Sequence, residues 1–533
     1  MHKNKRWLLV LLWMLLIPVI GIQAQDATPA SGGTLTFAFN ADWGVLDPAA
    51  TTVTFARNIM GFIYDPLLRT DPATGEIVPG LAESYEASED GKTITLHLRR
   101  DVSFHDGTPF NAAAVKFTFD RISDPALASP FAATISGPLD NIETPDDYTV
   151  VIHLKEPYAP YVDSLTQVVL APVSPTAVEK YGADFGLNPV GTGPFRFVST
   201  TPDEQIDLER NPDYNWAPSY ENHQGPAYLD HITVLNVPED STRMSLIETG
   251  DLDLVYNPLV DQLDFFRDDP AYSVQTLIRP GVPRVVVLNT ERFPFDDLGT
   301  RQAVAWAIDR QRILDEVFGG IGAVPSGVLT PGMAGFWADG ADQWPGFDLD
   351  KAAQMLADAG WADADGDGVL DKDGQAFEIT LGQIPGFPFD QYGQIIQNDL
   401  TKLGIKVEIE NEEQAAYLAD LRAGKWEMAG MLFPATDPDV LYVIGASASI
   451  DAAWNTARYN NPEVDTLLNQ GRTTLDLAQR AEIYHQVQQI MLNDMPYIPM
   501  YQIEEPYIVK AEYKDVKTDV QGFYDFYDTY IQQ

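Results

Sequence analysis

One acidic segment carries carboxylates at the spacing of a calcium-binding loop. The candidate ligands, at positions one, three, five, seven and nine of the loop, are Asp363, Asp365, Asp367, Val369 and Asp371. Four would offer side-chain carboxylates and the valine its backbone carbonyl, the oxygen set that a hard cation such as Ca²⁺ prefers. The twelfth position, where a bidentate glutamate belongs, is Gly374. The segment therefore predicts either a structural calcium site or a bare acidic turn.

Other residue types do not indicate catalysis. No two of the seven histidines have ligand spacing on a helix, and the nucleophile-elbow, zinc-protease and P-loop signatures do not occur. The chain has no cysteine, which excludes disulfides, thiolate metal sites and a cysteine-linked lipid anchor. We expect a protein that is not an enzyme and requires no cofactor. A secreted, calcium-dependent hydrolase is the remaining catalytic alternative.

Charge excludes one class of partner. The chain has 78 acidic and 34 basic residues, for a net charge of −44. Such a chain repels phosphate backbones and anionic lipid surfaces, so we expect no nucleic-acid partner. The simplest reason for so much negative charge is solubility.

The N-terminus has the pattern of a secretory signal. A basic start with Lys3, Lys5 and Arg6 precedes an apolar run from Trp7 to Ile22, and a small residue follows at Ala24. The run is short for a helix of ~20 residues that spans a bilayer. We therefore predict a signal peptide over residues 1–24 and a periplasmic or extracellular protein; an uncleaved membrane anchor is the alternative.

The elements that must position any site alternate between strands and helices. Period-two patterns predict strands over 34–39, 148–154, 232–237, 284–290, 377–381 and 405–410. Helical periods predict helices over 241–248, 301–318, 349–359, 391–403 and 477–492. Gly404 and the Gly319–Gly320 pair stand where helices end in a left-handed residue. This order predicts α/β lobes with mixed sheets.

The segment 91–122 combines a half-buried strand, a turn and a helix. Ile94, Leu96 and Leu98 alternate with polar residues, Asp106-Gly107 supplies the turn, and Asn111 is placed to cap the helix. This string closely resembles the signature of the family 5 extracellular solute-binding proteins, the peptide- and nickel-type receptors of ABC importers. Four further blocks resemble the family in the same order, at 188–197, 293–310, 459–465 and 494–501.

The resemblance implies a three-lobed periplasmic-binding-protein fold of type II, cluster C. Two main lobes are joined by hinge strands, and an extra lobe is added. On this pattern lobe I takes residues 25–61, 188–281 and 506–533, lobe II takes 62–187, and lobe III takes 282–505. The hinges are expected near Pro280–Arg284 and Tyr501–Pro506.

The resemblance also indicates where this chain departs from its family. In peptide-binding relatives an aspartate four residues before the proline of a DP or EP pair binds the ligand's α-amino group. Here the pair is Asp437-Pro438, and the position is Pro434. A buried ammonium without a counter-charge is costly. We therefore predict a neutral polar ligand such as an oligosaccharide, with an oligopeptide as the alternative and Asp437 as its possible anchor.

Aromatic residues suit a sugar ligand, because flat rings stack on sugar faces. The predicted lining of the family's ligand cleft is Trp43, Asn289, Phe433, Asp437, Trp454 and Tyr501. We expect a monomeric receptor that closes lobes I and III on its ligand and delivers it to ABC permease subunits. A ligand-sensing module with the same fold is a further alternative.

Overall fold

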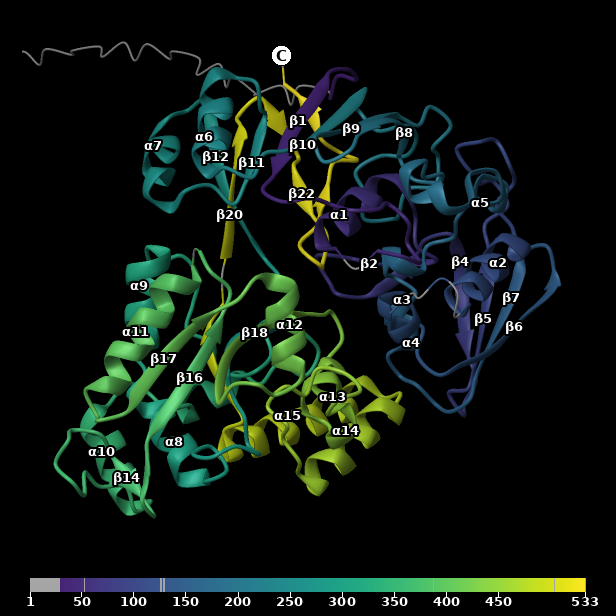
Figure 1. The fold of residues 1–533 in the computed structure, drawn as a ribbon. Helices are drawn as coiled ribbons and strands as arrows, with labels where there is room; N and C mark the ends of the chain where they lie inside the picture. Colours follow the sequence, from purple (N-terminus) through teal and green to yellow (C-terminus); the bar gives the residue numbers. More distant parts are fainter. Residues whose placement is uncertain are drawn as a thin grey trace, which may run out of the picture.

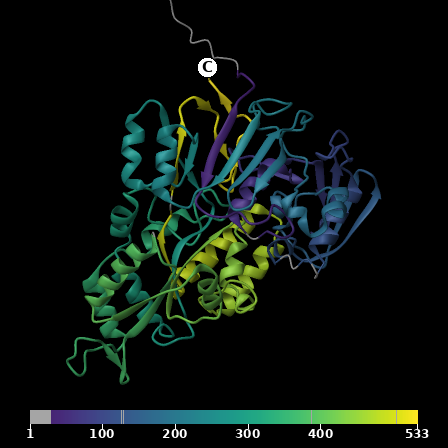
Figure 2. The ribbon, with the colours of Figure 1, turned by 45° about the horizontal axis from the view of Figure 1, so that its top comes forward.

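The structure is a computed structural model that describes residues 29–51, 53–124, 127, 130–386, 388–502 and 504–532. The predicted signal peptide, residues 1–24, lies outside the described residues. Within the described part of the chain, no helix combines the length and apolar character needed to cross a membrane. Three bodies, each with its own main sheet, make up the molecule (Figures 1 and 2).

The upper body in Figure 1, here lobe I, is built on a seven-stranded sheet. Its strands, in order across the sheet, are β12 (Tyr272–Ile278), β20 (Glu504–Lys510), β11 (Leu254–Tyr256), β1 (Thr34–Phe39), β10 (His231–Asn236), β9 (Gln205–Arg210) and β8 (Phe195–Thr201). β1 pairs in parallel with both β10 and β11. This central place explains why Leu35, Phe37 and Phe39 are buried.

The body on the right in Figure 1, here lobe II, contains a four-stranded antiparallel sheet. Its strands, in order, are β4 (Ala82–Ala87), β5 (Thr93–Leu98), β7 (Thr149–Leu154) and β6 (Leu139–Asp146). Along β5 the residues Ile94, Leu96 and Leu98 are buried, and Asn111 Oδ1 accepts a hydrogen bond from the N–H of Ala114 at 3.1 Å. The predicted strand, turn and helix cap are confirmed.

The lower body, here lobe III, contains a five-stranded mixed sheet. Its strands, in order, are β17 (Lys406–Asn411), β16 (Glu378–Gln383), β18 (Met428–Pro434), β13 (Gly281–Leu288) and β19 (Tyr497–Tyr501). Four small two-stranded sheets complete the β-structure: β2 (Leu68–Thr70) with β3 (Ile77–Pro79), β14 (Asp371–Lys372) with β15 (Gln375–Ala376), β21 (Tyr513–Lys514) with β24 (Tyr530–Ile531), and β22 (Lys517–Thr518) with β23 (Tyr524–Asp525).

Helices cover these sheets and fill the spaces between them. In lobes I and II they are α1 (Thr54–Ile63), α2 (Ala112–Ile122), α3 (Pro130–Ile135), α4 (Tyr161–Ser164), α5 (Pro175–Tyr181), α6 (Asp240–Thr249) and α7 (Leu263–Asp268). In lobe III they are α8 (Leu298–Ala307), α9 (Arg310–Phe318), α10 (Leu349–Asp358), α11 (Phe389–Thr401), α12 (Gln414–Arg422), α13 (Val440–Gly445), α14 (Pro462–Thr473) and α15 (Leu477–Asp494). Short 3₁₀ turns lie at Val168–Leu170, Gly182–Leu187, Val260–Gln262, Ala338–Gln343 and Ser447–Ser449.

The helix predicted over 301–318 is in fact two helices, α8 and α9. Ile308 between them has extended backbone angles of φ −103° and ψ 120°. Asp309 then starts the second helix, because its Oδ1 accepts a hydrogen bond from the N–H of Arg312 at 2.9 Å. Apolar residues recur with a helical period across both helices, so the sequence pattern does not reveal this internal cap.

The three main sheets define three lobes, but the hydrophobic cores do not follow the same division. One cluster runs without interruption from lobe I into lobe II, from Leu35 in β1 to Ile152 in β7. A second cluster lies within lobe III, and a small third one lies under α6 and α7 of lobe I. Lobes I and II therefore pack as one unit, and lobe III packs as another.

Two chain crossings join lobe III to lobe I. One runs from β12 to β13 through Arg279 and Pro280, and the other runs from β19 to β20. Both lie where the hinges were predicted. The predicted lobe boundaries stay a prediction, although each main sheet falls within one lobe apart from the ends of two strands: β13 begins at Gly281 and β20 at Glu504.

Two of the blocks on which the family resemblance rests bind each other. The N–H of His105 donates to the carbonyl of Gly191 at 2.9 Å, and His105 Nε2 lies 3.0 Å from the carbonyl oxygen of Gly193. A β-carbon at Gly193 would lie 2.6 Å from the carbonyl oxygen of Phe62 in α1. Burial lowers the pKa of His105 to about 4, so the ring is neutral at physiological pH. These blocks therefore serve the junction of lobes I and II.

Candidate ligand-binding site

All three lobes line one cleft, with an empty volume of about 840 Å³ that includes its open mouth. Lobe I contributes Thr54, Arg57, Arg279, Pro280, Gln521 and Phe523. Lobe II contributes among others Phe131, Tyr158, Asp163 and Gln167. In lobe III the end of β18 contributes Phe433 and Pro434, and the loop after it contributes Thr436, Asp437 and Asp439. Ligand sites in proteins commonly have such a mixture of apolar and polar walls.

Asp437 forms an ion pair within lobe III. Its two oxygens accept hydrogen bonds from Nη1 and Nη2 of Arg480, both at 2.6 Å. Oδ1 also accepts from the N–H of Asp439 at 2.7 Å. The side chain of Arg480 is only 4% exposed, and this arginine lies on α15. The bidentate pair fixes the loop and leaves the Asp437 carboxylate largely neutralised.

Asp439 lies deeper in the same loop. Its Oδ1 accepts from the hydroxyl of Tyr484 at 3.2 Å, and its Oδ2 lies 3.3 Å from both the hydroxyl of Tyr158 and Nε of Arg472. Burial raises the pKa of Asp439 to about 7, against the opposing attraction of Arg472. Tyr158 belongs to lobe II, so this carboxyl group also bridges two lobes.

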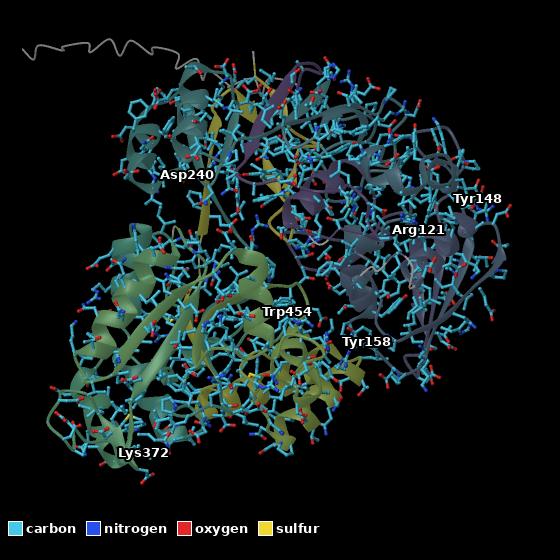
Figure 3. The ribbon with its side chains drawn as sticks, in the orientation of Figure 1. Arg121, Tyr148, Tyr158, Asp240, Lys372 and Trp454 are labelled. Carbon is cyan, nitrogen blue, oxygen red and sulfur yellow. The ribbon has the colours of Figure 1, made fainter. Side chains whose placement is uncertain are left out.

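A hydrogen-bonded chain crosses the cleft between lobes II and III. Nε2 of Gln167 donates to Oγ1 of Thr436 at 3.2 Å, and that hydroxyl donates to Oδ2 of Asp163 at 2.7 Å. Beside it, the N–H of Ala159 donates to the carbonyl of Arg472 at 2.7 Å. Burial, reinforced by the charge of Asp437, raises the pKa of Asp163. Figure 3 shows Tyr158 of lobe II beside this contact with lobe III.

The lobe I wall is positive. Nε of Arg279 donates to Oε2 of Glu505 at 2.9 Å, so this arginine is paired. Arg57 on α1 is not: within the described residues it forms no ion pair, and its Nε is buried without a hydrogen-bond partner. Burial, with the nearby charge of Arg279, lowers the pKa of Arg57 to about 10, which leaves it charged at neutral pH.

Only some of the six predicted lining residues lie at the cleft. Phe433 and Asp437 line the cleft. Trp454 lies behind Phe433, with the two ring centroids 6.1 Å apart. Phe433 and Asp437 are therefore cleft residues, and the Trp454 ring supports Phe433 from behind.

The other three predicted residues lie in the lobe interiors, away from the lining of this cleft. Trp43 is 3% exposed in the core shared by lobes I and II. Asn289 is buried, and its side chain donates to the carbonyl of Gly424 at 3.1 Å. Tyr501 packs against Phe318 with ring centroids 4.3 Å apart. The prediction for each of these residues rested on its position in the sequence pattern. That pattern does not show whether a side chain on a strand or turn faces the core or the cleft.

Sequence reasoning missed the cleft residues of lobes I and II. Arg57 lies in a helix with a strong apolar face, Tyr158 precedes the short helix α4, and Asp163 lies within that helix. No motif distinguishes them from surface residues. The one available signal was the absence of an acid at Pro434, and that signal led to the prediction of a neutral ligand and not to these residues.

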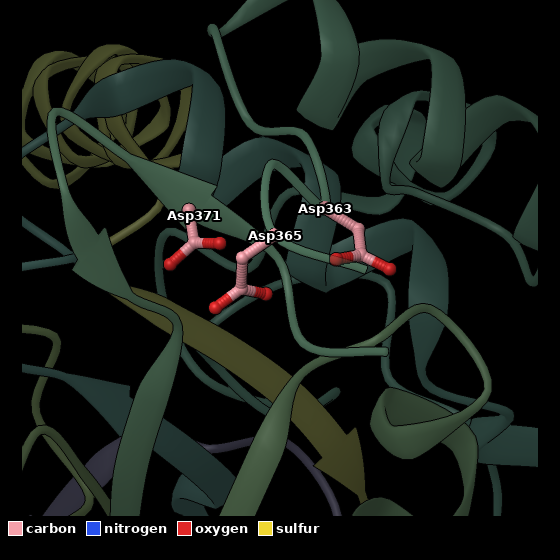
Figure 4. A group of neighbouring side chains, drawn as sticks. All are labelled: Asp363, Asp365 and Asp371. Carbon is pink, nitrogen blue, oxygen red and sulfur yellow. The ribbon is translucent and has the colours of Figure 1, made fainter. Parts of the chain in front are cut away.

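The acidic loop lies in lobe III (Figure 4). Carboxylate oxygens of Asp363, Asp365 and Asp371 lie within 4.8 Å of one another. The two oxygens of Asp363 accept backbone N–H groups of Gly366 and Gly368 at 2.7 and 3.1 Å. Three convergent carboxylates fit the oxygen set of a calcium ion in part, but the same bonds also suit a turn without metal. Structural calcium stays a prediction.

Comparison with known proteins decides the family. The model for "Bacterial extracellular solute-binding proteins, family 5 Middle" matches residues 76–451. This chain belongs to that family. Membership makes it an extracellular solute-binding protein, the class of receptor that serves ABC importers.

Individual relatives cover nearly the whole chain. The glutathione-binding protein GsiB of Escherichia coli K12 is 29% identical over 503 residues, 90% of this chain and 89% of GsiB. The structure of DppA from Helicobacter pylori, an ABC transporter-associated periplasmic binding protein in complex with peptide STSA, is 28% identical with a TM-score of 0.80, over 95% of this chain and 99% of that one. NikA from Brucella suis, in complex with Fe(III)-EDTA, is 26% identical with a TM-score of 0.82, over 94% of this chain and 100% of that one.

The relatives confirm the family and the fold class predicted from the sequence, a mixed α/β periplasmic-binding-protein fold. They do not support the preference for an oligosaccharide. The names given above specify glutathione, a peptide and a metal chelate as bound molecules. The peptide alternative fits these relatives better.

Proposed function

We propose that this protein is a monomeric transport receptor, rather than an enzyme or a sensor, that captures a small peptide-type ligand and delivers it to the permease of an ABC importer. The observation that carries the proposal is the single cleft walled by all three lobes, with charged side chains of both signs in its walls. Support for a peptide-type ligand comes from the relatives that bind glutathione and peptide STSA.

The cleft has the surfaces that a short peptide needs. Phe131, Phe433 and Phe523 provide apolar faces for side chains. Gln167 and Thr436 offer polar groups for backbone amides. A ligand so placed exchanges its bonds with water for bonds with all three lobes, which favours burial.

Closure follows from how the lobes are packed. Lobes I and II share one core, whereas lobe III has its own and is tied to lobe I by two crossings. A ligand that touches both units binds best when they are closed around it, so it shifts the open–closed equilibrium toward the closed form. The permease would then recognise the closed form.

A thermal-shift panel tests the ligand class. The probes are glutathione and STSA in one arm, and short oligosaccharides in the other. A probe at about 100 times its dissociation constant adds roughly 2.7 kcal/mol to the free energy of unfolding. We expect a rise of a few degrees in the peptide arm alone.

The matched variants are Phe433→Ala in the cleft and Phe265→Ala on the surface. Phe265 is 60% exposed on α7 of lobe I and is not among the residues that line the cleft. We expect Phe433→Ala to lose the shift with peptides and Phe265→Ala to retain it. A shift produced by the sugars and by no peptide contradicts the proposal.

A further inference from the structure

Within the described residues, two charged residues that line the cleft lack the oppositely charged partner that the other three have. They are Arg57 in lobe I and Asp163 in lobe II. Arg279, Asp437 and Asp439 in the same cleft all lie beside an opposite charge. The cleft therefore offers a cation on one wall and a carboxyl group on another, each without a counter-charge in the described residues.

The guanidinium of Arg57 is held in place by rings and not by a carboxylate. Its central carbon lies 4.7 Å from the ring centroid of Phe131 and 5.5 Å from that of Phe523. Nη2 donates to Oγ1 of Thr54 at 3.1 Å. A guanidinium has five N–H donors, and its Nε–H here is buried and unused within the described residues. Because the rings cover its faces, the in-plane edge with the N–H donors is the part of this guanidinium that suits a planar anion.

Asp519, an acid whose charge acts on Arg57, does not complete this fork. Asp519 attracts Arg57 only at longer range, since the two form no ion pair. Oδ1 of Asp519 accepts the backbone N–H groups of Gln521 and Phe523 at 2.8 and 2.9 Å. A half-buried arginine left in this state is costly for the ligand-free protein. A ligand that brings an anion removes this cost.

Asp163 is an acid that lacks a basic partner. Its Oδ2 accepts the hydroxyl of Thr436, and its Oδ1 accepts no hydrogen bond within the part of the chain that is described. No lysine, arginine or histidine there forms an ion pair with it. Pro434 occupies the position where the family resemblance implies an amine-binding aspartate, and it lines the same cleft. Asp163 is the acid in this cleft that is free to replace that aspartate.

We infer that Arg57 binds a carboxylate of the ligand and that Asp163 binds its ammonium group. This inference rests on the proposed function and makes the ligand dipolar, with its amine site moved from lobe III to lobe II. The ligand then joins lobe I to lobe II through its two charges and meets lobe III along its length.

End-blocked peptides test the inference by calorimetry. The probes are glutathione and STSA, each with free ends, with an acetylated amine, and with an amidated C-terminal carboxylate. The variants are Arg57→Gln, Arg57→Lys and Asp163→Asn. The matched surface controls are Arg267→Gln and Asp264→Asn, which change the same charges in an exposed ion pair on α7. Melting of each ligand-free variant checks that it is folded.

In the wild type we expect each blocked end to weaken binding about tenfold or more, the scale of a lost charge-assisted hydrogen bond. Arg57→Gln should bind the amidated and free peptides equally, and Asp163→Asn should do so for the acetylated and free peptides. Arg57→Lys, which keeps the charge, should restore part of the discrimination at the carboxylate. The surface controls should behave like the wild type.

Two outcomes overturn the inference while leaving the proposed function intact. One is a wild type that binds blocked and free peptides equally well. The other is a folded Arg57→Gln or Asp163→Asn variant that still discriminates as the wild type does. A wild type that binds no peptide of the panel overturns the proposed function, and the inference falls with it.

Discussion

At the scale of single residues, the role of Asp437 differs from the one predicted. Both of its oxygens bind Arg480, whose side chain is 4% exposed. Removing one partner of a buried pair leaves an uncompensated charge, which costs about 3–5 kcal/mol. The residue therefore acts on the cleft by holding the loop after β18 in place.

We predict that Asp437→Asn lowers the free energy of unfolding by about 3 kcal/mol, because the Arg480 charge loses its counter-charge. Denaturant unfolding measures this. The matched control is Asp120→Asn, which breaks an exposed pair with Lys116 and should cost less than about 1 kcal/mol. Equal stability of Asp437→Asn and the wild type contradicts the assignment.

Asp439 makes stability depend on pH. Its pKa is raised from 3.8 to about 7, so between these values the folded protein holds a proton that the unfolded chain releases. The folded state is therefore favoured at the acidic end of this window, and the contribution is lost as the pH rises through the folded pKa.

We predict that Asp439→Asn reduces the fall in stability between about pH 5 and about pH 8, because the amide carries no charge at either pH. Thermal unfolding at both pH values measures the difference, on the order of 1 kcal/mol or more. Asp163 and Asp519, whose pKa values burial also raises, titrate in both proteins, so the difference between variant and wild type reports Asp439. Parallel pH profiles for variant and wild type would exclude the effect.

At the scale of elements, the crossing into β13 depends on one glycine. Gly281 has φ +135°, and a β-carbon there would lie 2.2 Å from the carbonyl oxygen of Phe433. The close approach lets β13 pair with the end of β18 and sets the position of the cleft loop. The same backbone contact therefore fixes both the pairing of β13 with β18 and the position of the cleft loop.

We predict that Gly281→Ala destabilises the protein by about 2 kcal/mol or more and weakens peptide binding, because the methyl group must displace backbone at the cleft. Gly332→Ala is the matched control, since Gly332 has φ +89° with no atom within 4 Å of the added carbon. Comparable losses in both variants would mean that the positive φ matters and the contact does not.

For the acidic loop we predict weak structural binding of calcium. About 10 mM Ca²⁺ should raise the free energy of unfolding by roughly 1–3 kcal/mol, as expected for a dissociation constant of about 10⁻⁴ to 10⁻³ M. Asp365→Asn should abolish the rise, whereas Asp373→Asn, in the neighbouring turn of the β14–β15 hairpin, should not. No effect of calcium on the wild type identifies a bare acidic turn.

Sequence reasoning succeeded where local chemistry decides the structure. β1 was predicted at its observed bounds, Asn111 caps α2 as expected, and Gly404 ends the segment after α11 with φ +79°. It failed where tertiary contacts decide. Whether Trp43 faces the core or the cleft, and whether Asp437 is free or paired, depends on α15 and other distant elements. The fold was therefore predictable, and most of the cleft was not.

At the scale of the whole molecule, closure should move lobe III alone. We predict that a bound peptide shortens the distance between spin labels at Phe265→Cys in lobe I and Leu477→Cys in lobe III, both exposed positions. Labels at Phe265→Cys and Tyr85→Cys, in lobes I and II, should keep their distance because these lobes share a core. The absence of native cysteine makes both pairs specific. Movement between lobes I and II would contradict the two-unit description.

The place of β20 in the lobe I sheet has a consequence for how the chain reaches its native state. β20, residues 504–510, fills the gap between β12 and β11 and follows the whole of lobe III in the chain. Until it arrives, both neighbours present unpaired edges, and lobe I cannot close its sheet. Pairing across some 250 residues is also slow. We therefore expect the lobe I sheet to form only after the segment of lobe III, which precedes β20 in the chain, has been synthesised.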